Sequence, residues 1–211
     1  MVNSSVRDTR SLRYWERQAG SYDRRMEFAE RRFFAGSRPW LCGQASGDTL
    51  EVAVGTGMNL AHYPEDVRLT GVEWSAAMLA VARRRAGTLG RTADLWQGDA
   101  RALTFPDESF DTVVCTFSLC GISDERVALE EMARVLKPGG LLLLADHVAS
   151  SSRPLRMAQR LVDLLSVPTA GEHYCRRPLI GVREMGFAVE RHERFKAGVI
   201  ERFTARRPAA G

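Results

Sequence analysis

The sequence lacks the cysteine patterns of extracellular and zinc-binding proteins. Its four cysteines, Cys42, Cys115, Cys120 and Cys175, form no Cys-x-x-Cys pair and have no nearby histidine at metal-binding spacing. That spacing argues against the usual zinc motifs and against a disulfide framework. We therefore predict reduced thiols and no metal site.

Long apolar runs are also missing. No stretch approaches the roughly 20 consecutive apolar residues that a membrane-spanning helix needs. The amino terminus has no apolar segment typical of a signal peptide. We predict a cytoplasmic protein, and peripheral membrane contact stays open. The 211 residues, 45% of them hydrophobic, are enough for one sizeable core.

The excess of positive charge is small and comes almost entirely from arginine. The formal net charge is +4 and the isoelectric point is about 9.1. A solvated surface explains this balance, and the alternative is an anionic partner such as a phospholipid surface, an acidic substrate or RNA. No nucleic-acid partner is expected, because the aromatic residues are not interleaved with the basic ones as a stacking platform requires.

One strand and its glycine turn form the most informative stretch. Leu50, Val52 and Val54 alternate with polar or small residues, which is typical of a short buried strand. Gly55 and Gly57 then bracket a tight turn, where glycine lets a ligand approach the backbone closely. The carboxyl edge of strands in an open α/β sheet is where nucleotide-like ligands bind.

The rest of the chain repeats a strand-then-helix pattern. Further strands are predicted at residues 68–73, 94–97, 112–117 and 141–144, with Ser75 and Ser123 as caps of two intervening helices. This spacing indicates an α/β fold with a doubly wound parallel sheet. Apolar residues near 187–189 and 199–203 predict a closing β-hairpin. No linker interrupts the sequence, so we predict a single domain over residues 1–211.

Three acids are candidates for ligand binding. Glu73 ends the second strand, where a carboxylate can accept hydrogen bonds from both ribose hydroxyls. Asp99 follows the third strand, where it or the Ala100 amide could contact an adenine edge. Glu51 lies inside the first strand, and a buried acid needs a partner, for which a cationic ligand is a candidate.

A dinucleotide-binding protein is the first alternative. Its turn has a third glycine where this chain has Leu60, and Pro64 breaks the following helix within a turn. A Tyr-x-x-x-Lys catalytic pair is also missing from the sequence. An NAD-dependent oxidoreductase is thus disfavoured. The second alternative is a non-catalytic binding module, because a fold does not determine a function.

Five motifs in order resemble the class I S-adenosylmethionine-dependent methyltransferases. They lie at residues 51–57, 71–73, 98–100, 105–111 and 136–140. The similarity, over about residues 14 to 195, is to the small-molecule and lipid branch with its ubiquinone/menaquinone-biosynthesis enzymes and phosphatidylethanolamine N-methyltransferases. It implies a seven-stranded, Rossmann-like, mostly parallel sheet with an antiparallel carboxyl-terminal hairpin.

The resemblance also implies a reaction and a cofactor. The cofactor is S-adenosylmethionine, and the reaction is methyl transfer by in-line displacement to a nucleophilic N, S or O atom of a small molecule or lipid-like acceptor. Cofactor contacts are expected from Tyr22, Glu51, Gly55, Gly57, Glu73, Trp74, Asp99, Ala100 and Thr116. The family usually has glycine where Ala53 stands. Residues 1–45 are expected to form a helical lid and residues 150–185 an insert that shapes the acceptor pocket.

Two histidines are candidate catalytic residues. A base is needed only if the acceptor arrives protonated. His147 ends the fifth strand and His173 lies in the insert. Residues 114–120 and 146–148 also resemble the membrane-associated thiol methyltransferases. We hypothesise that an arginine cluster near the insert receives an anionic or lipid-like acceptor or docks on an anionic membrane surface. Its members are Arg153, Arg156, Arg160, Arg176 and Arg177.

Overall fold

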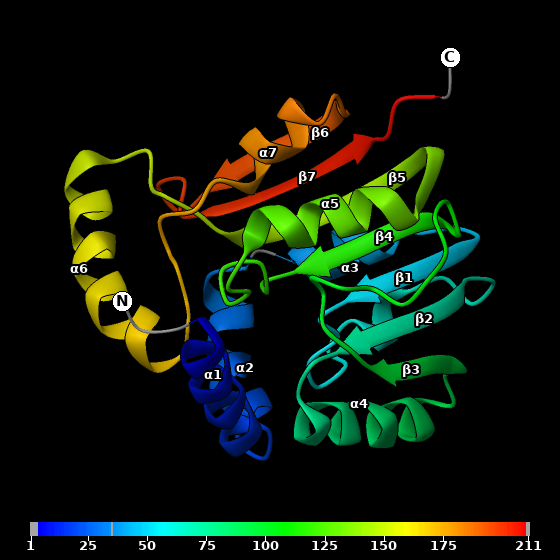
Figure 1. The fold of residues 1–211 in the computed structure, drawn as a ribbon, viewed down its shortest axis with the longest axis horizontal. Coiled ribbons are helices and arrows are strands. Elements are labelled where there is room, and N and C mark those ends of the chain that lie inside the picture. Colours follow the sequence, from blue (N-terminus) through cyan, green and yellow to red (C-terminus); the bar gives the residue numbers. More distant parts are fainter. Residues whose placement is uncertain (1–3, 35, 210–211) are drawn as a thin grey trace.

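The structure is a computed structural model that describes residues 4–34 and 36–209. Seven strands form one sheet in the order β3-β2-β1-β4-β5-β7-β6 (Figure 1). The strands are β1 (Asp48–Val52), β2 (Arg68–Glu73), β3 (Ala93–Gln97), β4 (Phe110–Thr116), β5 (Leu136–His147), β6 (Ala188–Phe195) and β7 (Ile200–Arg206). The first five run parallel, and β7 pairs antiparallel with both β5 and β6. The predicted doubly wound, mostly parallel sheet with its carboxyl-terminal hairpin is confirmed.

Helices precede the first strand and connect most of the later ones. They are α1 (Ser4–Gln18), α2 (Tyr22–Arg32), α3 (Ser37–Cys42), the short 3-10 turn η1 (Leu60–His62), α4 (Ala76–Leu89), α5 (Glu125–Val135), α6 (Arg153–Thr169) and α7 (Pro178–Glu184). In Figure 1, α6 stands apart from the sheet, and α1 and α2 lie below its carboxyl-terminal edge. None of the described helices is both long enough and apolar enough to cross a membrane.

The structure confirms one predicted helix cap, and it corrects another cap and the start of one strand. Ser75 caps α4, because its Oγ accepts a hydrogen bond from the amide of Met78. The cap of α5 is Asp124, not Ser123, because the Asp124 carboxylate is the group that accepts from Val127 N. The predicted fifth strand was too short: β5 begins at Leu136, directly after α5.

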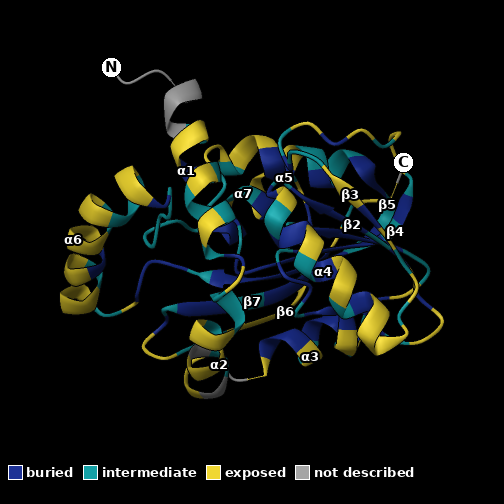
Figure 2. Cartoon of the chain, turned by 90° about the horizontal axis from the view of Figure 1, so that it is seen from below, coloured by how far each residue is buried: buried dark blue, intermediate teal, exposed yellow. Residues whose placement is uncertain are grey.

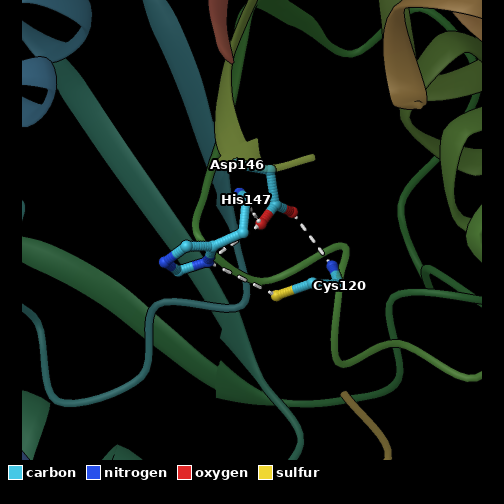
Figure 3. A group of neighbouring side chains, drawn as sticks. All are labelled: Cys120, Asp146 and His147. Atoms are coloured by element: carbon cyan, nitrogen blue, oxygen red, sulfur yellow. Dashed lines mark hydrogen bonds and ion pairs between the residues drawn. The ribbon is translucent and has the colours of Figure 1, made fainter. Parts of the chain in front are cut away.

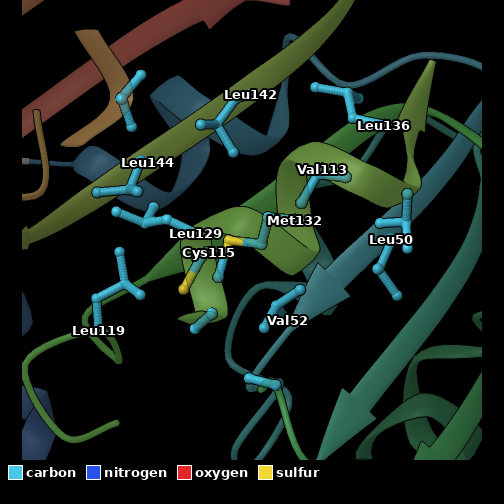
Figure 4. Close-up of a cluster of buried hydrophobic side chains, with 14 of the residues drawn as sticks. Leu50, Val52, Val113, Cys115, Leu119, Leu129, Met132, Leu136, Leu142 and Leu144 are labelled. Carbon is cyan, nitrogen blue, oxygen red and sulfur yellow. The ribbon is translucent and has the colours of Figure 1, made fainter. Parts of the chain in front are cut away.

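The core fills both faces of the sheet. On one face, alternate residues of β1, β4 and β5 pack against α5 and α7. Figure 4 shows Leu50, Val113 and Leu142 gathered around Met132 of α5. The other face packs against α3 and α4. This two-sided burial explains the apolar runs at residues 113–115 of β4 and 141–145 of β5. It also fixes the carboxyl ends of β1, β2 and β3 side by side.

Candidate active site

Glu73 links three segments at the carboxyl edge of the sheet. Its Oε2 accepts a hydrogen bond from the Gly55 amide at 2.8 Å, and its Oε1 accepts one from the Ser75 amide at 2.8 Å. The side chain is buried, and burial raises its pKa while these two amides lower it. Each oxygen keeps a further lone pair for a ligand hydroxyl. The carboxylate therefore holds the glycine turn against the start of α4 and still has acceptor capacity.

The two glycines of the turn serve different purposes. Gly55 has a φ of 59° and lines a cavity, and a Cβ there would meet nothing within 4 Å. A Cβ on Gly57, whose φ is 81°, would lie 2.7 Å from Leu60 Cδ1 and 3.2 Å from Ala82 Cα. Gly55 thus leaves room for a ligand beside the backbone, whereas Gly57 is required by packing. The predicted cofactor contact of Gly57 stays a prediction.

Ala53 occupies a backbone conformation that suits glycine. Its φ is 57°, in the left-handed region, and it lines the cavities on both sides of the turn. A non-glycine residue pays about 1–2 kcal/mol for this conformation. The departure from the family's usual glycine is therefore a source of local strain.

Asp99 and Ala100 line a cavity together with Ala53, Val72 and Trp74, which we call the adenine-side cavity after the adenine contact predicted for Asp99 and Ala100. Arg101 Nε donates to both Asp99 oxygens, at 3.0 and 3.1 Å. Burial alone would raise the pKa of Asp99, but the hydrogen bonds from Arg101 hold it below its usual range. The structure thus brings Asp99, Ala100 and Trp74 together as predicted, with the Asp99 charge already paired. Their contacts with adenine stay predictions.

Glu51 and Thr116 belong to a buried network beneath the cavities. Asn59 Nδ2 donates to Glu51 Oε1 and the Tyr63 hydroxyl donates to Glu51 Oε2, both at 2.9 Å. Thr116 Oγ1 accepts from Asn59 Nδ2 at 2.9 Å and from Arg38 Nη1 at 2.8 Å. Burial raises the pKa of Glu51 to about 7. Internal donors supply the partners for which a cationic ligand was the candidate, so a direct cofactor contact of Glu51 stays a prediction.

A second cavity adjoins the adenine-side cavity and extends past the glycine turn, and we call it the donor cavity. The two spaces share the walls Ala53, Trp74, Gly121 and Ile122. Beyond them, Glu73 and Gly55 line the space from the sheet, and Tyr22 lines it from α2. Room beside the Gly55 backbone, a buried acid at the end of β2 and the apolar face of Trp74 together fit an adenosyl ligand.

A larger aromatic cavity opens next to the donor cavity. It has a volume of about 510 Å³. Its walls are mostly apolar and come from α1, α2 and the segment after α2, from the ends of β4 and β5, from α6 and from the start of β7: Tyr14, Trp15, Tyr22, Met26, Phe33, Phe34, Phe117, Leu155, Val199 and Ile200. Arg25, Glu172, Tyr174, Lys196 and His147 add polar groups. Trp15, Tyr22, Phe117 and Glu172 line both this cavity and the donor cavity.

Phe117 stands at the junction of the two cavities in a strained conformation. Its φ is 53°, which is an outlier for a bulky residue. The ring stacks on Phe34, with centroids 4.0 Å apart and an interplanar angle of 15°. Strain of this kind collects where the surrounding structure fixes a functional geometry. The distortion places an aromatic ring between the two spaces.

His147 faces the aromatic cavity and lies in a cluster with Asp146 and Cys120 (Figure 3). Its ring has aromatic neighbours in Phe34 at 5.2 Å and Tyr174 at 5.8 Å between centroids. Asp146 is buried, and its carboxylate accepts from the amides of Cys120 at 2.9 Å and of His147 at 2.7 Å. Asp146 thus fixes the backbone at both residues, and His147 is the candidate base that lies beside the junction.

The same cluster could bring three ligand atoms to a metal ion. One ligand atom from each of Cys120, Asp146 and His147 lies within 4.8 Å of the other two. Burial raises the pKa of the Cys120 thiol well above its usual value, so the thiol stays protonated. Both Asp146 oxygens already accept backbone hydrogen bonds. These hydrogen bonds give Asp146 a structural role in the backbone around the cluster, and the absence of a metal site stays a prediction.

His173 lies at the other end of the site. It lines the adenine-side cavity with Asp99 and Ala100. Its neighbour Glu172 instead lines both the donor and the aromatic cavities, and its Oε2 accepts from the Tyr174 hydroxyl at 2.9 Å. Burial raises the pKa of Glu172. Sequence reasoning missed Glu172 because no spacing signal marks it, and only the folded insert brings it to the junction.

The arginines of the predicted cluster have different partners, and their role in binding an acceptor stays a prediction. Arg176 Nη1 donates to the carbonyls of Leu119 and Ile122, and Arg156 Nη1 donates to that of Ser150. These two arginines support loops around the site. Arg177 lies near the buried Glu201, with a separation of 3.9 Å. The side chains of Arg153 and Arg160 are exposed on α6.

Comparison with known sequences places the central part of the chain in a family. Residues 50–144 match the family described as a methyltransferase domain. The phosphatidylethanolamine N-methyltransferase of Cereibacter sphaeroides is 40% identical over 116 residues, which cover 54% of this chain and 57% of that one. A ubiquinone/menaquinone biosynthesis C-methyltransferase of Pseudoalteromonas translucida is 35% identical over 129 residues, covering 58% and 51%. The chain thus spans about half the length of these relatives.

Solved structures share the fold. An S-adenosylmethionine-dependent methyltransferase of Thermotoga maritima superposes with a TM-score of 0.68 at 24% identity, covering 92% of this chain and 99% of that one. A [4+2]-cyclase superposes with a TM-score of 0.67 at 21% identity, covering 82% and 79%. Together with the motif match, the fold confirms the predicted resemblance. Residues 50–144 match the methyltransferase-domain family, and the chain has the fold of the S-adenosylmethionine-dependent methyltransferases.

Proposed function

We propose that this chain transfers a methyl group from S-adenosylmethionine to a nucleophilic N, S or O atom of an apolar, lipid-like acceptor. One observation carries the proposal: Trp15, Tyr22, Phe117 and Glu172 line both the donor cavity and the aromatic cavity. Two ligands in these spaces would meet at those four residues. The relatives named for a phospholipid and for quinones support a lipid-like acceptor, and the name of the phospholipid relative, an N-methyltransferase, supports a nitrogen atom.

S-adenosylmethionine, when bound, supplies an electrophilic methyl group. The residues that would hold its adenosyl part are Glu73, Trp74 and Ala100. Trp15 and Phe117 would exclude water at the junction and fix the acceptor in line. Positioning of this kind can contribute about 7–11 kcal/mol to a reaction between two molecules.

His147 is proposed as the group that accepts a proton from the acceptor. His147 lines the aromatic cavity and not the donor cavity, so its ring would contact a bound acceptor and not the bound cofactor. Glu172 is proposed to balance positive charge at the junction, because it is a buried carboxylate that both spaces share. If the lipid-like acceptor carries an anionic group, Arg25 and Lys196 on the same walls would pair with it.

The lid and the insert are proposed to build the acceptor site. The amino-terminal helices supply Tyr14, Trp15 and Tyr22 to the aromatic cavity. The insert supplies Leu155 and Glu172. These contributions support the proposed division of residues 1–211 into a lid at 1–45, a donor-binding sheet and an insert at 150–185.

The test is turnover with S-adenosylmethionine labelled in its methyl group. The acceptor panel contains apolar amines, thiols, phenols and phospholipids, each also supplied in a short-chain form. We expect label in one acceptor class and an equal amount of S-adenosylhomocysteine. Binding of S-adenosylmethionine without transfer to any class would favour a non-catalytic binding module. Tighter binding of NAD than of S-adenosylmethionine would favour an oxidoreductase.

A further inference from the structure

Helix α6 turns its polar side toward the protein. The buried residue of this helix is Gln159, whose Nε2 donates to the Val148 carbonyl at 2.9 Å and whose Oε1 accepts from the Ser150 amide at 2.7 Å. One turn further on, the Asp163 carboxylate accepts from the Tyr174 amide at 2.8 Å. Hydrogen bonds to the backbone of its neighbours, rather than apolar burial, thus attach this helix to the body of the protein.

The opposite side of α6 is apolar and exposed. Met157, Leu161, Leu164 and Leu165 are 57%, 64%, 70% and 75% exposed. Their spacing of four, three and one residues places them on one helical face. Figure 2 shows α6 exposed along most of its length, at the margin of the molecule. A contiguous apolar face of this kind in solvent marks an interaction surface.

Arginines border this face on α6 itself. Arg153 and Arg160 are exposed and lie at one edge of the apolar stripe. Neither has an acidic partner among residues 4–34 and 36–209. The acid of α6, Asp163, points inward and is used by Tyr174. The outward surface of the helix is therefore apolar with a cationic edge.

A second cationic stripe adjoins the carboxyl-terminal end of α6. Arg10, Arg13 and Arg17 recur along α1 at helical spacing, and all three are exposed. Arg10 Nη1 donates to the Pro168 carbonyl of α6 at 3.2 Å, which places the stripe beside that helix. Within the described part of the chain these three arginines also have no acidic partner. Positive charge thus surrounds the apolar face from two helices.

The same helix borders both ends of the proposed active site. Leu155, in its first turn, lines the aromatic cavity. Val167, in its last turn, lines the adenine-side cavity. A surface that covered the outward face of α6 would therefore lie close to the openings through which ligands reach the site.

We propose that α6 lies in the plane of an anionic phospholipid bilayer, with its leucines among the acyl chains and the arginines on the headgroups. An interfacial helix needs this combination of an apolar face and basic residues. A second copy of the chain fits less well, because two such faces would bring the same positive charges together. Docking does not require methyl transfer, but its purpose, delivery of a lipid-like acceptor to the aromatic cavity, rests on the proposed function.

The test is flotation of the full chain with vesicles. One set contains phosphatidylcholine only, and the other contains about one third phosphatidylglycerol. We expect flotation with the anionic set, reduced by high salt. Leu161→Ser/Leu165→Ser should weaken binding roughly tenfold per leucine. Arg153→Gln/Arg160→Gln should weaken it about fivefold per arginine.

Control variants show whether a loss of vesicle binding comes from the apolar face of α6. Leu89 is 47% exposed at the end of α4, so Leu89→Ser removes a similar leucine elsewhere and should float like the wild type. Unchanged unfolding temperature and S-adenosylmethionine affinity would show that the α6 variants fold. No flotation of the wild type, or equal flotation of the double leucine variant, would overturn the proposal. A dimer in solution that the leucine changes dissociate would also overturn it, in favour of self-association.

The two proposals fail separately. Methyl transfer to a short-chain acceptor in detergent needs no vesicle, and the leucine variants should retain it. Transfer without flotation would contradict the docking proposal alone. Flotation without transfer to any acceptor would contradict the proposed function alone.

Discussion

The donor end and the acceptor end of the site are built in different ways. At the donor end, neighbouring strands meet, and Glu73 binds the backbone of the glycine turn and of the next helix start. At the acceptor end, aromatic side chains converge from α1, α2, β4 and β5, and Glu172 and Tyr174 come from the insert. The first construction is local and polar, and the second depends on segments that are distant in sequence. From this comparison we infer that one edge of the sheet can bind the methyl donor, while elements distant in sequence shape the cavity that selects the acceptor.

The largest effect should come from the acceptor side. His147→Asn should lower the rate of methyl transfer by about 10²–10⁴-fold, the range typical of a lost general base. The affinity for S-adenosylmethionine should stay the same, because His147 does not line the donor cavity. Steady-state turnover with the acceptor found in the panel, together with calorimetry, measures both.

His173→Asn is the matched control for this change. It removes the other candidate base, which lines the adenine-side cavity. We expect an effect on cofactor affinity larger than any on turnover at saturating cofactor. If His173→Asn and His147→Asn lowered the rate equally, the separation between the two ends would be wrong.

The next effect should come from the donor side. Glu73→Ala removes a buried charged acceptor, for which about 1.5–3 kcal/mol is typical, so S-adenosylmethionine affinity should fall by at least tenfold. Calorimetry measures the affinity, and Glu65→Ala, at an exposed position, is the control. Unchanged affinity in Glu73→Ala would remove Glu73 from the cofactor site.

The contrast between the ends also explains how much the sequence could predict. Glu73, Gly55 and Asp99 follow predicted strands, and parallel strands must place their carboxyl ends at one edge. Phe117 ends the strand predicted at residues 112–117, so the same rule places it at this edge, but nothing in the sequence marks its left-handed conformation. Glu172 carries no such signal, because the fold of residues 150–185 decides where it lies. Gly57 shows a third case, in which the motif was recognised but packing against Leu60 and Ala82 explains the glycine.

Glu51 offers a smaller test that involves stability. Its pKa is raised in the folded protein to about 7, against 4.5 for a freely solvated glutamate, so the folded state loses stability relative to the unfolded chain as the pH rises between these values. Glu51→Gln cannot ionise. Relative to the wild type, it should gain on the order of 3 kcal/mol of unfolding free energy as the pH rises across this range.

Denaturant unfolding of the wild type and of Glu51→Gln at each pH gives this difference in unfolding free energy. The other titrating groups contribute equally to both proteins, so their contributions cancel. A pH-independent difference would contradict the burial of an ionising Glu51. Calorimetry on the same variant tests its predicted cofactor contact. Unchanged affinity would assign Glu51 to the buried network with Asn59 and Tyr63 alone.

The smallest effect should come from Ala53. Ala53→Gly relieves the left-handed conformation at a small cost in unfolded-state entropy, so the protein should gain up to about 1 kcal/mol of stability. Thermal unfolding measures this gain. Ala86→Gly, inside α4, is a control for which the opposite sign is expected, because glycine inside a helix should cost the protein about 1 kcal/mol of stability. A loss of stability in Ala53→Gly would contradict the strain at this position.

The most direct test of the donor end is calorimetric titration of the wild-type chain with S-adenosylmethionine and with NAD under the same conditions. The arrangement of Glu73, Gly55 and Trp74 predicts saturable binding of S-adenosylmethionine with one site per chain and no measurable binding of NAD. Binding of NAD in preference to S-adenosylmethionine, or of neither, would contradict the assignment of this cavity to a methyl donor.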